Sequence, residues 1–163
     1  MSPHLLRRYT AVAARAAFAA GPLLARHAGR PRTVQTKRSA IDLVTEIDQA
    51  SERLIRRLLR RAAPGFGILG EEYGADRPQS GTRWIVDPLD GTNNFVHGLP
   101  FFGVSIGLEE DGVMQAGVIY DPMRRECFSA WRGGGAFLNG RRIRVSPASR
   151  LARSLLATGF SSR

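Results

Sequence analysis

The chain has 163 residues, which is enough for one domain with a hydrophobic core and too few for two comfortable ones. Hydrophobic residues make up 43% of it, as in globular proteins, and no apolar run approaches the roughly 20 residues that span a bilayer. The net charge of +10 comes almost wholly from arginine, and the single cysteine, Cys127, excludes an internal disulfide. We therefore expect a cytoplasmic protein.

The N-terminal part is predicted to be helical. Apolar residues recur at helical spacing over residues 3–28, so we expect one helix there rather than a signal peptide. A polar connection and a short apolar segment follow. A second helix is expected to begin after Thr45 or Asp48 and to end near Ala63, before Pro64-Gly65.

The second helix carries a cluster of basic residues. The simplest interpretation is a solvated helix face, and a binding patch for nucleic acid is the alternative. No aromatic residue interleaves with these bases along the chain, so stacking on single-stranded nucleic acid is not indicated. The cluster consists of Arg53, Arg56, Arg57, Arg60 and Arg61.

Beyond the second helix the hydrophobic period changes from helical to extended. Asp111-Gly112 and Asn139-Gly140 predict tight hairpins, because both dipeptides tolerate positive φ. Two helices followed by hairpin-linked strands favour an α+β fold, with the helices packed on a largely antiparallel sheet. Strands are predicted at residues 66–69, 84–86, 101–108, 113–120, 126–131, 137–138, 143–145 and 154–158.

The segment with the most chemical information runs from Trp84 to Thr92. An apolar strand leads to Asp87, Pro88 is expected to break the ladder, and Asp90 follows three residues after Asp87. A turn at this spacing can bring both carboxylates to one side, which suits a hard divalent cation. An isolated Asp-Pro-x-Asp, however, is usually only a turn with a helix cap.

The next residues favour an anion site. Gly91 lets the backbone approach a ligand closely, and Thr92 with Asn93 is expected to open a short helix whose amide groups favour a phosphate. Glu71, after another short strand, and Asp48, at the start of the second helix, supply further acids. Taken singly, each of these acids has an ordinary structural explanation.

In this order, the motifs resemble the inositol monophosphatase family. The Asp-Pro-Leu-Asp-Gly-Thr string alone is also compatible with bisphosphate nucleotidases and related lithium-sensitive phosphatases. The residues that follow it favour the inositol monophosphatase branch. The matching pieces are Lys37, Asp42-Leu43-Val44-Thr45-x-x-Asp48, Gly70-Glu71-Glu72, Trp84 to Thr92, Asn94-Phe95-Val96-His97-Gly98-Leu99-Pro100-Phe101 and Gly133-x-Gly135-Ala136-Phe137-x-Asn139-Gly140.

The resemblance implies a fold and a domain assignment. Residues 1–163 would be the N-terminal metal- and phosphate-binding domain of a truncated chain, the first half of a layered αβαβα sugar-phosphatase fold without its C-terminal α/β half. Apolar surface that the second half covers in the family would make such a chain prone to self-association. Family members are commonly homodimers.

The resemblance also implies a metal site for two or three magnesium ions. Asp87 would bridge two ions, and Glu71 and the backbone carbonyl of Leu89 would complete the first. Asp90 would serve the second ion, and Glu71 would reach a third through water. The reaction would be in-line attack of a metal-activated water on a phosphate monoester.

Further roles follow from the same resemblance. Thr92, hydrogen-bonded to Asp48, would orient the attacking water. The amides of Gly91 and Thr92, beside Asp90, would hold the phosphate, and Lys37 would lie on a mobile loop that closes near the ions.

Three functions stay open on the sequence. The first is a magnesium-dependent phosphatase of inositol monophosphate or a related sugar or polyol phosphate. The second is a weak or inactive member that binds RNA or the transcription machinery, and the third is a 3′(2′),5′-bisphosphate nucleotidase-like activity. No membrane partner is expected.

Overall fold

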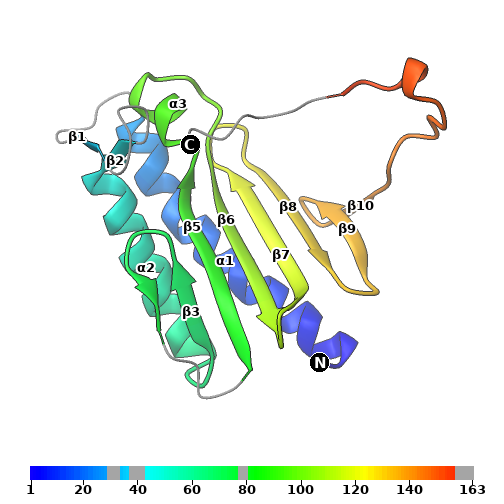
Figure 1. Ribbon diagram of the computed structural model, residues 1–163, viewed down its shortest axis with the longest axis horizontal. Coiled ribbons are helices and arrows are strands. Elements are labelled where there is room, and N and C mark those ends of the chain that lie inside the picture. Colours follow the sequence, from blue (N-terminus) through cyan, green and yellow to red (C-terminus); the bar gives the residue numbers. More distant parts are fainter. Residues whose placement is uncertain (29–33, 37–42, 77–80, 157–163) are drawn as a thin grey trace.

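The computed structural model describes residues 1–28, 34–36, 43–76 and 81–156 of the chain. Two long helices, α1 (Pro3–His27) and α2 (Glu46–Ala62), lie together against one face of a large sheet (Figure 1). The α+β prediction is therefore confirmed. In the described part of the chain, no helix is long and apolar enough to cross a membrane.

The sheet has eight strands in the order β10-β9-β8-β7-β6-β5-β3-β4, and a separate pair of strands, β1 and β2, lies near the start of α2. The pairs are antiparallel except for β3 with β5, which is parallel. The bounds are β1 (Val34–Thr36), β2 (Leu43–Thr45), β3 (Gly67–Gly70), β4 (Gly74–Ala75), β5 (Thr82–Asp90), β6 (Gly103–Glu110), β7 (Val113–Asp121), β8 (Glu126–Trp131), β9 (Gly135–Leu138) and β10 (Arg141–Ile143).

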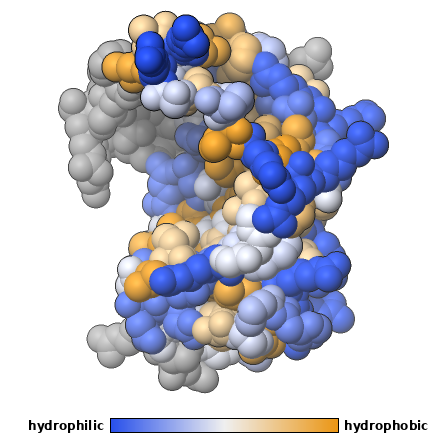
Figure 2. Space-filling view, turned by 90° about the vertical axis from the view of Figure 1, so that its right-hand side faces the viewer, coloured by the Kyte–Doolittle hydropathy of each residue, from blue (hydrophilic) through white to orange (hydrophobic). Residues whose placement is uncertain are grey.

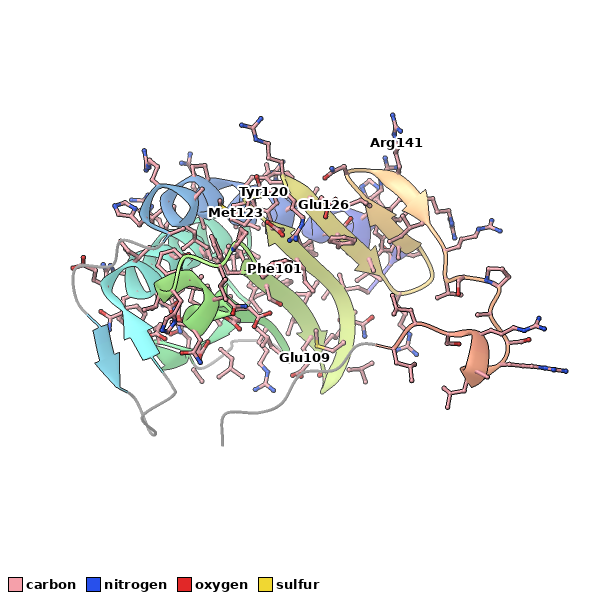
Figure 3. The ribbon with its side chains drawn as sticks, turned by 90° about the horizontal axis from the view of Figure 1, so that it is seen from above. Phe101, Glu109, Tyr120, Met123, Glu126 and Arg141 are labelled. Atoms are coloured by element: carbon pink, nitrogen blue, oxygen red, sulfur yellow. The ribbon has the colours of Figure 1, made fainter. Side chains whose placement is uncertain are left out.

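Helix α1 packs on the middle of the sheet through small residues. Its N-terminus is capped by the Ser2 hydroxyl, which accepts from the Leu5 amide at 3.4 Å. Gly21 lies where α1 meets β7, and a Cβ there would come within 2.3 Å of the Tyr120 ring. In Figure 3, Tyr120 points toward the helices and Glu109 lies on the opposite side of the sheet. The side-chain period of two along the strands thus separates a helix-covered face from an outer face.

Part of the outer face of the sheet is apolar. Ile119, Phe128 and Ile143 are exposed by 52%, 38% and 37% and line a shallow hollow of about 380 Å³. Hydrophobic residues also show at the surface between hydrophilic ones when the molecule is seen from the β9–β10 side (Figure 2). An apolar sheet face of this kind ordinarily belongs to an interface.

Both hairpin predictions are confirmed, because Asp111 and Asn139 have φ values of 51° and 49° in the β6–β7 and β9–β10 turns. The prediction that Pro88 breaks the ladder is wrong in part. Strand β5 continues to Asp90, and the irregularity is a register shift between Asp87 and Asp90.

The C-terminal strand prediction is also wrong for the residues that are described. Leu151–Arg153 forms a 3-10 turn, and residues 154–156 are not in a strand. Leu155 is 99% exposed, so this apolar segment has no neighbour to pair with among the described residues. Residues 157 and 158 lie outside them.

Candidate metal and phosphate site

Strand β5 carries both aspartates of the site at its C-terminal end. Asp87 is half-buried and pairs in register with Ser105, whereas Asp90 is exposed and pairs with Gly103. The register shift between them takes up the extra residue. The Leu89 amide donates to Asp87 Oδ1 at 3.1 Å. The Asp87 side chain therefore fixes the two-residue connection that leads to Asp90.

A tight turn follows β5 and opens a short helix, α3 (Thr92–Val96), as predicted. Gly91 has φ 87° and ψ 37°, a left-handed conformation. A Cβ there would lie 2.9 Å from the Phe101 carbonyl oxygen, so both the space and the dihedral require glycine. The Thr92 hydroxyl donates to the Leu89 carbonyl at 3.1 Å and closes the turn.

Glu71 reaches the same place from the neighbouring strand. Because β3 and β5 are parallel and Gly70 pairs with Val86, the residues that follow them emerge side by side. The Glu71 amide donates to the Val86 carbonyl at 3.2 Å and extends this pairing by one step. Glu71 and Asp87 therefore come together through sheet register, although 16 positions separate 71 from 87.

The three acids form one electrostatic cluster. The pKa of Asp87 is raised to about 7, chiefly because burial penalises its charged form, and further by the negative charges of Glu71 and Asp90. Glu71 and Asp87 are also joined by a side-chain hydrogen bond, which needs a proton on one of them. In the described residues, no three such side chains have the spacing of a preformed ligand set. The cluster nevertheless gathers hard-oxygen donors that repel one another when ionised, and this donor chemistry fits a divalent cation.

The expected roles of two predicted site residues, Asp48 and Lys37, stay untested. Asp48 is fully buried on the inner face of α2, and its expected bond with Thr92 stays a prediction, since the Thr92 proton is used on Leu89. Lys37 lies outside the described residues.

One supporting residue was missed by sequence reasoning. The Glu52 carboxylate is fully buried and accepts from the Glu72 amide at 2.7 Å and from Arg56 Nε at 2.6 Å. Gly70 must be glycine, since a Cβ there would lie 1.9 Å from Glu52 Oε1. The available signal was an acidic residue on the apolar stripe of the helix, one turn before Ile55.

The same helix ties down the second acidic loop. The Ser51 hydroxyl donates to the Pro88 carbonyl at 3.1 Å, between the two aspartates. Neighbouring residues of α2 therefore hold the loop of Glu71 and the loop of Asp87.

Comparison with known proteins agrees with this arrangement. The sequence model of the inositol monophosphatase family matches residues 5–163. The chain belongs to the inositol monophosphatase family.

Individual family members extend the comparison. The chain is 43% identical over 150 residues to inositol-1-monophosphatase of Rhizobium meliloti, covering 91% of this chain and 56% of that protein. It is 45% identical over 156 residues to Nus factor SuhB of Pseudomonas aeruginosa, covering 93% and 58%. The crystal structure of the suppressor protein suhB from Bartonella henselae aligns with a TM-score of 0.83 at 45% identity, covering 88% and 57%. The chain thus spans a little over half the length of these family members.

We predict that Glu52→Gln destabilises this family member by about 3 kcal/mol, because it removes one partner of a buried ion pair and leaves Arg56 short of a carboxylate. Urea unfolding checks this. Arg60→Gln is the matched control: its guanidinium, 55% exposed, pairs with Asp76 at the surface, so the loss should stay within about 1 kcal/mol. Equal losses for the two variants would contradict the prediction.

Asp87 gives a pH prediction for the protein in a chelating buffer. Its folded-state pKa of about 7 lies above its usual 3.8, so its contribution to stability is complete below the lower value and is lost as pH rises through the upper one. The Asp87→Asn variant has no titrating carboxyl group at this position, so it does not lose stability in this way as pH rises. The free energy of unfolding of the variant minus that of the parent should therefore rise between about pH 4 and pH 8. A difference that stays constant across this range would refute the assignment.

Proposed function

We propose that this chain carries the metal- and phosphate-binding half of a magnesium-dependent phosphomonoesterase that acts on inositol monophosphate or a related sugar or polyol phosphate. The observation that carries the proposal is the convergence of Glu71, Asp87 and Asp90 in one cluster beside the turn at Gly91. Residues 1–163 would be the N-terminal domain of this enzyme, which we expect to be cytoplasmic and homodimeric.

The residues that would hold magnesium are the three acids and the Leu89 carbonyl. That oxygen already accepts from Thr92, but a carbonyl has two lone pairs and can also face a cation. When bound, magnesium would supply positive charge against the phosphate and lower the pKa of a water. The mutual repulsion of the carboxylates favours such binding, because a cation relieves the cost of keeping Asp87 charged.

Thr92 is suited to orient the attacking water. Because its hydroxyl proton is directed to Leu89, its oxygen keeps lone pairs that can accept from a water on the open side. Pairing with the buried carboxylate of Asp48 would need that hydroxyl to rotate. The amides of Gly91 and Thr92 lie at the start of α3, where helix amides have no acceptor within the helix, so they are suited to donate to a phosphate.

We predict that Asp90→Asn reduces phosphate release from inositol 1-phosphate in the presence of magnesium to the level of a protein-free blank, because a ligand charge is lost. Colorimetric phosphate release and magnesium titration by calorimetry measure the two effects. Asp111→Asn makes the same chemical change in the β6–β7 turn, at the other end of β6, and should leave both values unchanged.

The substrate arms of this experiment separate two activities. Faster hydrolysis of a 3′,5′-bisphosphate nucleotide than of inositol 1-phosphate would indicate a nucleotidase-like activity at this site. If magnesium binds and Asp90→Asn abolishes that binding, but neither ester is cleaved, the metal site stands and turnover by this chain is refuted. Equal phosphate release by Asp90→Asn and the parent would refute the site.

A second candidate function is binding of RNA or the transcription machinery, which the name Nus factor SuhB of a relative and the basic face of α2 favour. Arg53, Arg57 and Arg60 are exposed on that face. Arg53 also lies 6.0 Å from the ring centre of Tyr73, so an aromatic from another loop joins the patch. The interpretation of the cluster as a solvated face is wrong for Arg56, which is buried against Glu52.

If this face binds RNA, retention of a single-stranded RNA should fall steeply with salt, and Arg57→Gln should lower the slope of log K against log salt by about one. Filter binding at several ionic strengths measures this slope. Arg150→Gln is the matched control, because it removes the same charge from an exposed site away from α2. Retention that does not change with salt would refute RNA binding by charge.

A further inference from the structure

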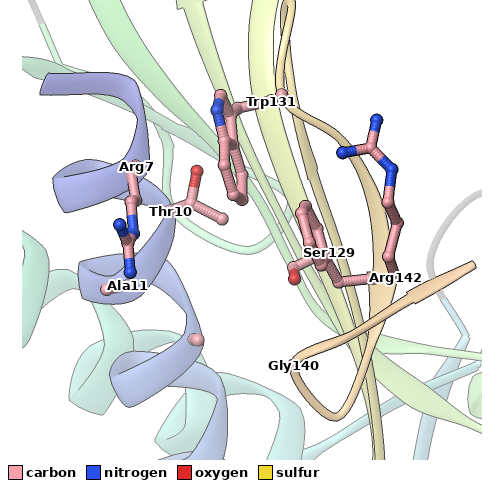
Figure 4. A pocket seen from close by; sticks show the side chains of 10 residues that line it. Arg7, Thr10, Ala11, Ser129, Trp131, Gly140 and Arg142 are labelled. Atoms are coloured by element: carbon pink, nitrogen blue, oxygen red, sulfur yellow. The ribbon is translucent and has the colours of Figure 1, made fainter. Parts of the chain in front are cut away.

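A cavity of about 500 Å³ lies between the first half of α1 and the edge strands β8–β10, away from the acids of the candidate site. Figure 4 shows Arg7, Thr10 and Ala11 on one wall and Ser129, Trp131 and Arg142 on the other. Its volume is in the range of cavities that hold small organic ligands.

The two walls differ in shape. The α1 wall presents small side chains, those of Thr10, Ala11 and Ala14. The sheet wall carries an aromatic platform made of two rings that stack on each other, those of Trp131 and Phe137, with centroids 4.8 Å apart and an angle of 7°. A further planar ring can extend this stack from an outer face. A small-residue wall facing flat rings leaves a slot, and a slot of this kind favours a planar, largely apolar body.

Two glycines leave the space that the platform occupies. A Cβ at Gly134 would lie 1.9 Å from Trp131 Nε1, and one at Gly135 would lie 2.7 Å from an Arg142 nitrogen. The indole therefore lies directly on the backbone of Gly134, in the turn before β9, and the guanidinium on that of Gly135, the first residue of β9. Arg142 also lies 5.9 Å from the ring centre of Phe137, which adds a cation to the stack.

The cavity is positively charged. Its lining contains two arginines, Arg7 and Arg142, and no acidic residue. Within the described part of the chain, neither arginine takes part in an ion pair, whereas Arg56, Arg60, Arg83 and Arg124 all do. A guanidinium that faces a cavity without a carboxylate is available for a ligand anion, which it can bind through two parallel hydrogen bonds.

We propose that this cavity binds a flat aromatic or heteroaromatic ring that carries a carboxylate or phosphate. The ring inserts between α1 and the Trp131–Phe137 platform, and the anionic group lies near Arg142. Such a site is separate from the phosphate-ester site and does not depend on the metal.

Two pairs of probes test this proposal: naphthalene-2-carboxylate against its neutral carboxamide, and adenosine monophosphate against adenosine. The two tryptophans give a built-in reference in proton–nitrogen NMR spectra, since Trp84 is 1% exposed in the core and Trp131 lines the cavity. We expect a saturable shift of the Trp131 indole signal and none of the Trp84 signal. Trp131→Phe assigns the two signals.

Arg142→Gln should weaken binding of the anionic probe by about threefold to fivefold and leave that of the neutral probe unchanged. Arg141→Gln is the matched control, because Arg141 neighbours it on the same strand but points away from the sheet (Figure 3). Ala11→Trp, which fills the slot from an exposed helix position, should abolish binding of both probes.

The pair of probes with the larger shift tells whether carboxylate or phosphate is preferred. Equal affinity for the anionic and neutral probes, equal losses in Arg141→Gln and Arg142→Gln, or shifts of Trp84 as large as those of Trp131 would each overturn the proposal. The absence of any shift with all four probes would overturn it as well.

Discussion

The arrangement of the candidate site depends on the buried carboxylate of Glu52. It accepts from the Glu72 amide and from Arg56, and so attaches the loop after β3 to α2. A carboxylate that is fully buried can stay charged only with such partners. Arg56 in turn reaches Asp76 at 3.0 Å. Burial alone would raise the pKa of Asp76, but the hydrogen bonds and charges of Arg60 and Arg56 lower it. The position of Glu71 is therefore set by this chain of charges as well as by the sheet.

This framework opposes the repulsion within the site. Glu71 and Asp87 come together through parallel register, and the burial of Asp87 makes its charge costly. When both are ionised they repel each other strongly, and the hydrogen bond between them forms only while one of them keeps a proton. The Glu52 anchor on one loop and the bond from Ser51 to the Pro88 carbonyl on the other hold them in place. If the proposed cation binds here, its charge would offset this repulsion.

Local signals made much of the fold predictable. The β8 range was predicted to the residue, and the two hairpins followed from dipeptides that accept positive φ. The role of Glu52 was not predictable, because a helical period tells which face is buried but not which loop lies across from it. Pro88 has no amide proton to donate, but β5 continues past it because the pairing with β6 shifts register between Asp87 and Asp90. That shift depends on β6. Long-range partners decide such details, and a single sequence does not contain them.

The overall charge and the local charge of the molecule act in opposite directions on an anionic ligand. A net charge of +10 attracts a phosphate ester over a distance of about a Debye length, near 8 Å at physiological salt. Beside the C-terminal ends of β3 and β5, however, the carboxylates of Glu71, Asp87 and Asp90 would repel the same ester when they are ionised. Under the proposed function, the long-range attraction would bring the ester to the protein, and a bound cation would offset the local repulsion. The slot beside Trp131 is lined by two arginines and no acidic residue. An anion there is attracted both by the net charge of the molecule and by the nearby arginines, so it needs no metal.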